Sequence, residues 1–99
     1  MSERELRKIE DEEGRKIGEA EYLNGEPHGL TRLWSSDGVM ILEDEMESGE
    51  YHGKYSSWWN NGQKKEEGQY RKGARVGIYR WYLENGELWQ EHNYGTGEA

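Results

Sequence analysis

The chain has 99 residues, of which 31% are hydrophobic and 34% are charged, and its formal net charge is −8. This length fits one small domain, and with no Phe the five Trp and seven Tyr side chains must supply much of the apolar packing. The absence of Cys excludes a disulfide framework, a thiol nucleophile and a Cys-based zinc site.

The charges are unevenly distributed along the sequence. The whole net charge of −8 lies in residues 1–49, with acidic runs at 10–13 and 43–45. This asymmetry is typical of a solvated face or of an acidic surface for a basic partner. The longest apolar run, 39–42, is too short to cross a membrane, and the first five residues lack the apolar stretch of a signal peptide. We therefore expect no membrane span and a cytoplasmic location.

The sequence repeats with a period of 24 residues. Three sets of glycines keep this spacing: Gly38, Gly62 and Gly86; Gly29, Gly53 and Gly77; and Gly25, Gly49, Gly73 and Gly97. Two lines of large side chains keep it as well: Trp34, Trp58 and Tyr82; and Tyr22, Met46, Tyr70 and Tyr94. We predict a single repeat domain over 1–99, with repeats at about 18–42, 43–66 and 67–91 and partial units at 1–17 and 92–99.

Each unit is predicted to form a β-hairpin. Asp37-Gly38, Asn61-Gly62 and Asn85-Gly86 indicate short turns, and the segments 24–29, 48–53 and 72–77 are interpreted as longer loops. The segments between them have strand length and composition, and they lie at 16–23, 29–36, 39–47, 53–60, 63–71, 77–84 and 87–94. We expect an all-β fold, a single antiparallel meander of about seven strands, in which residues 1–10 either add an edge strand or fray.

The even period places equivalent residues on the same face of the sheet. Trp34, Trp58 and Tyr82 should form one line, with steps of roughly 10 Å, and Tyr22 begins the second. Whether the two lines share a face stays open, because a two-residue turn and a three-residue bulged turn differ by one in register. The rings are either the packing of a curled sheet or, in part, an open surface for a partner.

Residues 55–70, Tyr-Ser-Ser-Trp-Trp-Asn-Asn-Gly-Gln-Lys-Lys-Glu-Glu-Gly-Gln-Tyr, and residues 77–88 resemble the MORN repeat in its bacterial variant. The resemblance covers about residues 6–97, and this variant is typical of the YwqK-family antitoxins. The first unit departs from the pattern, with Ser36-Asp37-Gly38 at its turn and an apolar return over 39–42. The resemblance implies a β-hairpin array with a binding role, as a scaffold, as the partner of a toxin or in contact with phospholipid.

The sequence contains no recognisable catalytic or metal-binding pattern. His28 and His52 are one repeat apart and are interpreted as loop residues, because a spacing of roughly 10 Å is too long for one metal ion. No nucleophile elbow and no phosphate-binding glycine loop is present. The basic residues around Lys64 and Arg80 alternate with acids, which favours cross-strand ion pairs over nucleic-acid binding. We expect no enzyme activity, no cofactor and no metal.

These features favour a protein that neutralises or inhibits a partner enzyme, as an antitoxin, an immunity protein or a phage inhibitor. The partner would be a toxin or another nucleic-acid-acting enzyme with a basic surface. The candidate contact residues are Trp34, Trp58, Trp59, Trp81 and Tyr82 as anchors and Glu43, Asp44, Glu45 and Glu47 as steering charges. The alternative is a structural or scaffolding module that acts by self-association, as a homodimer through its edge strands, or by contact with phospholipid.

Overall fold

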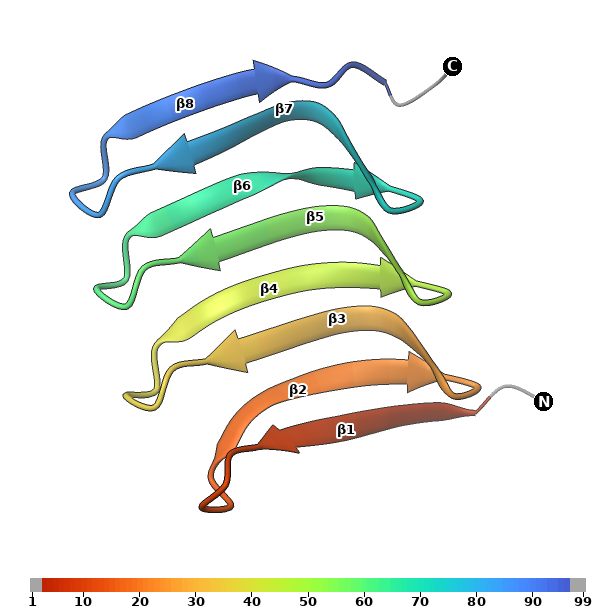
Figure 1. Cartoon of the computed structure of the whole chain (residues 1–99). Coiled ribbons are helices and arrows are strands. Elements are labelled where there is room, and N and C mark those ends of the chain that lie inside the picture. Colours follow the sequence, from red (N-terminus) through yellow and green to blue (C-terminus); the bar gives the residue numbers. More distant parts are fainter. Residues whose placement is uncertain (1–2, 97–99) are drawn as a thin grey trace.

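The computed structural model describes residues 3–96 as one antiparallel sheet in which every strand pairs with its neighbours in the sequence (Figure 1). The eight strands are β1 (Arg4–Glu10), β2 (Lys16–Leu23), β3 (Glu26–Trp34), β4 (Met40–Glu47), β5 (Glu50–Trp58), β6 (Lys64–Arg71), β7 (Ala74–Tyr82) and β8 (Leu88–Asn93). The molecule measures 39 by 39 by 15 Å, which is the shape of a single layer. The predicted meander is confirmed, and residues 4–10 form its first edge strand.

One set of turns is shorter than the sequence indicates. At Asn24-Gly25 the chain reverses in two residues, with φ values of 52° and 86°, and Ser48-Gly49 and Lys72-Gly73 repeat this geometry. Positive φ at both central residues defines the type I′ turn of a tight hairpin. The prediction of longer loops at 24–29, 48–53 and 72–77 is therefore wrong. The strands expected at 29–36, 53–60 and 77–84 begin three residues earlier, at 26, 50 and 74.

The other set of turns contains a glycine bulge. At the first of the three Asp-Gly and Asn-Gly turns, Gly38 N–H donates to the Ser35 carbonyl at 2.9 Å, Ser35 N–H donates to the Val39 carbonyl at 2.8 Å, and Gly38 has a φ of 85°. A type I turn followed by a left-handed glycine is the three-residue hairpin loop. The turns at 59–63 and 83–87 have the same hydrogen bonds. These turns therefore resolve the register that the sequence left open.

A second glycine position bends the longer strands. The pairing of β2 with β3 shifts between Ala20↔Thr31 and Tyr22↔Pro27, so that β3 has extra residues around Gly29, whose φ is 109°. The same shift recurs one repeat later around Gly53. Bulges of this kind bend a strand, and β3, β5 and β7 curve near their amino-terminal ends (Figure 1).

The register places the two lines of large side chains on opposite faces of the sheet. Tyr22 lies two residues from Ala20, on the face that also carries Thr31 opposite Ala20. Trp34 lies two residues from Arg32, on the other face. We call the face with Tyr22, Met46, Tyr70 and Tyr94 the tyrosine face, and the face with Trp34, Trp58 and Tyr82 the charged face.

The core of this thin sheet lies on the tyrosine face. Among residues 3–96 only Gly18, Ala20, Asp44, Ser57 and Tyr79 are buried, and Tyr79 is fully so. The Tyr79 ring has four aromatic neighbours with centroids 4.8–6.4 Å away, namely Tyr55, Tyr70, Trp81 and Tyr94. Aromatic packing within one layer therefore replaces the aliphatic core of a two-layer domain.

Candidate protein-binding surface

A row of paired residues crosses the charged face from one edge of the sheet to the other. Each member stands opposite the next on the neighbouring strand, in the order Lys8, Glu19, Arg32, Glu43, Ser56, Glu67, Arg80 and Glu91. We call these eight residues the charge row. Their signs alternate along the row, with Ser56 as the one uncharged member. Opposite charges in cross-strand pairs stabilise a sheet, so the row favours the pairing of β1 to β4 with one another and of β6 to β8 with one another.

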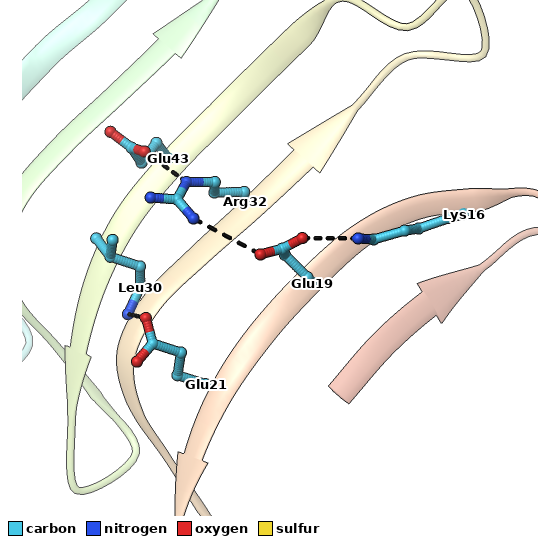
Figure 2. Close-up of polar contacts among 6 residues, drawn as sticks. All are labelled: Lys16, Glu19, Glu21, Leu30, Arg32 and Glu43. Atoms are coloured by element: carbon cyan, nitrogen blue, oxygen red, sulfur yellow. Dashed lines mark hydrogen bonds and ion pairs between the residues drawn. The ribbon is translucent and has the colours of Figure 1, made fainter. Parts of the chain in front are cut away.

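Arg32 is the centre of the first half of the charge row (Figure 2). Its Nε donates to Glu43 at 2.8 Å, and its Nη1 lies 3.6 Å from Glu19. The other carboxylate oxygen of Glu19 accepts a hydrogen bond from Lys16 Nζ at 2.8 Å. The contact with Lys16, and secondarily the charge of Arg32, holds the pKa of Glu19 below its usual value.

The same arrangement recurs two repeats later. Glu67 lies 3.3 Å from Lys64 Nζ and 3.6 Å from Arg80 Nη1, and Arg80 Nε donates to Glu91 at 2.7 Å. Tyr82 Oη donates to Glu67 at 2.6 Å, and this hydrogen bond is the main reason that the pKa of Glu67 is lowered. The predicted ion pairs around Lys64 and Arg80 are thus present.

Two further carboxylates on this face lie outside the ion pairs of the charge row. Glu21 and Glu45 are equivalent residues one repeat apart, beside the bulge glycines Gly29 and Gly53. Glu21 accepts a hydrogen bond from the Leu30 N–H at 3.3 Å, as Figure 2 shows. Within residues 3–96 neither carboxylate forms an ion pair. The charged face is therefore acidic over β2–β4.

Aromatic rings lie at the end of the same face. Trp34 and Trp58 are half-buried, and the Nζ atoms of Lys16 and Lys64 each stand 5.6 Å from their ring centres. Tyr82 is the third member of this line and is held by its hydrogen bond to Glu67. We define the acidic–aromatic surface as six residues of the charged face: Glu19, Glu21, Glu43, Glu45, Trp34 and Trp58.

The structure separates two of the predicted ring residues from this surface. Trp81 lies on the tyrosine face, where its Nε1 donates to Glu66 at 3.1 Å. Trp59 follows β5, and its Nε1 donates to the Tyr82 carbonyl at 3.2 Å. Glu47 lies on the charged face at the end of β4, two residues after Glu45, and an oxygen of its carboxylate lies 3.3 Å from His52 Nε2.

Asp44 also lies apart, because successive strand residues point to opposite faces. It is 3% exposed, stands between Thr31 and Tyr55 on the tyrosine face, and its Oδ1 has no hydrogen-bond partner within the described chain. Burial raises its pKa to about 6. The sequence run Glu43-Asp44-Glu45 therefore does not form one acidic patch.

Sequence reasoning missed the exposed apolar residues of the two edge strands. Leu6 is 55% exposed on β1, and Leu88 and Trp89 are 52% and 64% exposed on β8. Trp89 occupies the position of Ile17, Ile41 and Lys65 in the repeat. A Trp in the last predicted strand, which forms an edge of the sheet, was the sequence feature that indicated exposed apolar surface there.

Within residues 3–96 no group of three or more His, Asp or Glu side chains is placed to hold a metal ion. His28 and His52 lie inside β3 and β5 rather than in loops, because those strands begin earlier than the sequence indicates. The described chain has no helix that is long and apolar enough to cross a membrane.

The geometry above defines an open, single-layer array of β-hairpin repeats. Residues 51–72 and 75–95 each match the family model of the MORN repeat variant, and the two matches cover the β5–β6 and β7–β8 hairpins. These two segments are thus repeats of the MORN variant type, as the resemblance implied. Comparison with curated proteins and with solved structures gave no match. The match is to the repeat, so the likeness to the YwqK-family antitoxins stays a prediction.

Proposed function

We propose that this protein is a non-enzymatic binding module that neutralises a partner enzyme through the acidic–aromatic surface. MORN repeats indicate a binding or scaffolding role in general. The observation that carries the finer proposal is a pair of carboxylates without an ion-pair partner in the described chain, Glu21 and Glu45, on the face that also carries Trp34 and Trp58. An acidic surface with rings at its end matches a basic cleft of an enzyme that acts on nucleic acids.

The charges and the rings would contribute differently to such a complex. Complementary charge mainly raises the association rate, whereas buried Trp and Tyr side chains dominate the affinity. Glu19 and Glu43 already share Arg32, so their charges are partly compensated within the chain. Glu21 and Glu45 form no ion pair in the described chain, although the charge of Arg32 also acts on Glu21, so both carboxylates are available to the partner.

The test is capture of a partner by the tagged full chain from the cells that produce it, at low and then moderate salt, followed by mass spectrometry. We expect a stoichiometric enzyme, and we expect the purified protein to inhibit that enzyme. The variant Glu21→Gln/Glu45→Gln should capture it at least about tenfold more weakly, with the loss in the association rate. The matched control Glu84→Gln/Glu87→Gln changes the net charge equally, in an exposed turn, and should capture normally.

Two results would contradict this proposal. The first is a partner whose activity is unchanged by the purified protein. The second is equal loss of capture in both double variants, which would point to net charge rather than to the acidic–aromatic surface.

The second candidate function is a structural module that self-associates. It is favoured by a separate observation, the two open edges of the sheet (Figure 1). An acidic face repels anionic lipid, so phospholipid contact has no such support.

A further inference from the structure

The two edge strands lie at opposite ends of the sheet (Figure 1). All residues of β1 and β8 are exposed. Apolar side chains are nevertheless present on both, Leu6 and Ile9 on β1 and Leu88 and Trp89 on β8. The outward N–H and C=O groups of an edge strand are a template for pairing with a further strand.

The repeat shows which strand would continue the sheet after β8. β8 is equivalent to β2, β4 and β6, and within the chain each of these pairs with the odd-numbered strand that follows it. β1 lies one period before β3 and is therefore equivalent to β3, β5 and β7. The strand that would follow β8 in the array is thus equivalent to β1, and a second copy of the chain offers such a strand at its open edge.

The charge row leads to the same conclusion. The row begins with a base, Lys8 on β1, and ends with an acid, Glu91 on β8. In the repeat, Lys8 and Glu91 correspond to Arg32 and Glu19, which stand opposite each other on β3 and β2. Lys8 of a second copy placed opposite Glu91 would continue the alternation of signs. A join between two β1 strands would instead bring together two edges that each carry three bases and two acids.

We propose that copies of this chain pair head to tail, β8 of one copy against β1 of the next, as one continued sheet. The register of β2 with β3 predicts Glu91 opposite Lys8 of the second copy, Gln90 opposite its Ile9 and His92 opposite its Arg7. Because the two joined edges differ, the contact does not close on itself, and further copies extend the sheet. This proposal is independent of the neutralisation of an enzyme.

The first experiment measures the mass of the full chain by size-exclusion chromatography with light scattering over a wide range of concentrations. We expect the wild-type mass to rise with concentration. Lys8→Glu and Glu91→Lys should each weaken the association at least about tenfold, because like charges then face each other across the join. An equimolar mixture of the two variants should associate again, since each mutated edge then meets an edge of opposite charge.

Circular dichroism of each variant checks that the sheet is intact, because Lys8 also stands opposite Glu19 and Glu91 also stands opposite Arg80. The mixing experiment keeps the proposal falsifiable even where a single variant loses stability. Intact variants whose mixture stays monomeric would overturn it, as would a wild-type chain that is monomeric throughout.

The second experiment uses the absence of natural Cys. A chain with Ile9→Cys mixed with a chain with Gln90→Cys should form a disulfide-linked pair, because cross-strand partners have Cβ atoms about 5 Å apart. Faster cross-linking of Gln90→Cys to itself would overturn the head-to-tail arrangement and show a symmetric join of two β8 strands.

Discussion

The ring of Tyr79 lies directly against Gly68 of the neighbouring strand, where a Cβ atom at position 68 would collide with the ring. Tyr79 is fully buried by this contact and by the rings around it. The glycine therefore makes room for the single largest buried side chain among the described residues. In a sheet without a second layer, the room that Gly68 leaves for the Tyr79 ring takes the place of a conventional two-layer core.

Gly68→Ala should destabilise the fold by about 2 kcal/mol, because the added methyl group displaces the Tyr79 ring from its neighbours. Gly68 does not have a positive φ, so a loss of stability in Gly68→Ala would reflect packing rather than backbone strain. Urea unfolding followed by tryptophan fluorescence measures the free energy of unfolding. Gln69→Ala, on the opposite face of β6, is the matched control. Equal free energies of unfolding for Gly68→Ala and wild type would show that the packing of the Tyr79 ring does not depend on its contact with Gly68.

Asp44 should make the protein less stable as the pH rises from about 4 to about 6. Its folded-state pKa of about 6 exceeds the unfolded value of about 3.9, so the folded state binds the extra proton in this window. Above pH 6 the buried carboxylate is charged and its Oδ1 lacks a partner. Asp44→Asn should therefore raise the free energy of unfolding at pH 7.5 by about 1–2 kcal/mol.

Urea unfolding of wild type, Asp44→Asn and the exposed control Asp37→Asn at several pH values checks this prediction. The difference between Asp44→Asn and wild type should shrink as the pH falls below 6, whereas Asp37→Asn should follow wild type. If the difference in free energy of unfolding between Asp44→Asn and wild type were independent of pH, a group other than Asp44 would be responsible for the pH dependence of stability.

Arg32→Gln should raise the pKa of Glu19 toward its ordinary value, because one of the two cations beside that carboxylate is lost. Lys16 remains, so the pKa should not return fully. The cost in stability should be small and should shrink in high salt, since these groups are partly exposed. NMR titration of the Glu19 carboxylate measures the pKa, with Glu67 of the second half of the row as the internal control. An unchanged Glu19 titration would contradict the geometry of Figure 2.

Lys72→Asn should stabilise the fold by about 0.5–1 kcal/mol, because Lys72 has a φ of 49° and Asn tolerates the left-handed region better than Lys. The equivalent residue of the first type I′ turn is Asn24, with a φ of 52°. Ser48→Asn should act in the same direction. Thermal unfolding detects the gain, and Lys54→Asn, inside β5, should not show it. A loss of stability in both turn variants would mean that these turns are not of type I′.

The period and the glycines determine much of this fold from the sequence alone. Asp37-Gly38 and its equivalents mark hairpins because glycine adopts positive φ without steric cost. Neither Ser48 nor Lys72 is typical of a left-handed position, so the sequence predicts longer loops where the structure has two-residue turns. The strands that follow these turns therefore begin three residues earlier than the sequence predicts.

The candidate surface was only partly accessible from the sequence. The residue types were sufficient to select Trp34, Trp58, Glu43 and Glu45, which the structure places on one face. The burial of Asp44 follows from its alternation with Glu43 along β4 and from the rings of neighbouring strands, and that packing depends on partners far apart in the chain.

By itself the sequence determined the local features: a 24-residue period, antiparallel hairpins, an even spacing that keeps equivalent residues on one face, and an acidic amino-terminal half. Only the tertiary structure decided which face of the sheet each line of equivalent residues occupies. One extra residue in a turn moves every side chain of the following strand to the other side of the sheet, so only the observed register could separate the tyrosine face from the charged face. The charge row also depends on the tertiary structure, because its members lie far apart in the sequence and become neighbours only when the strands pair.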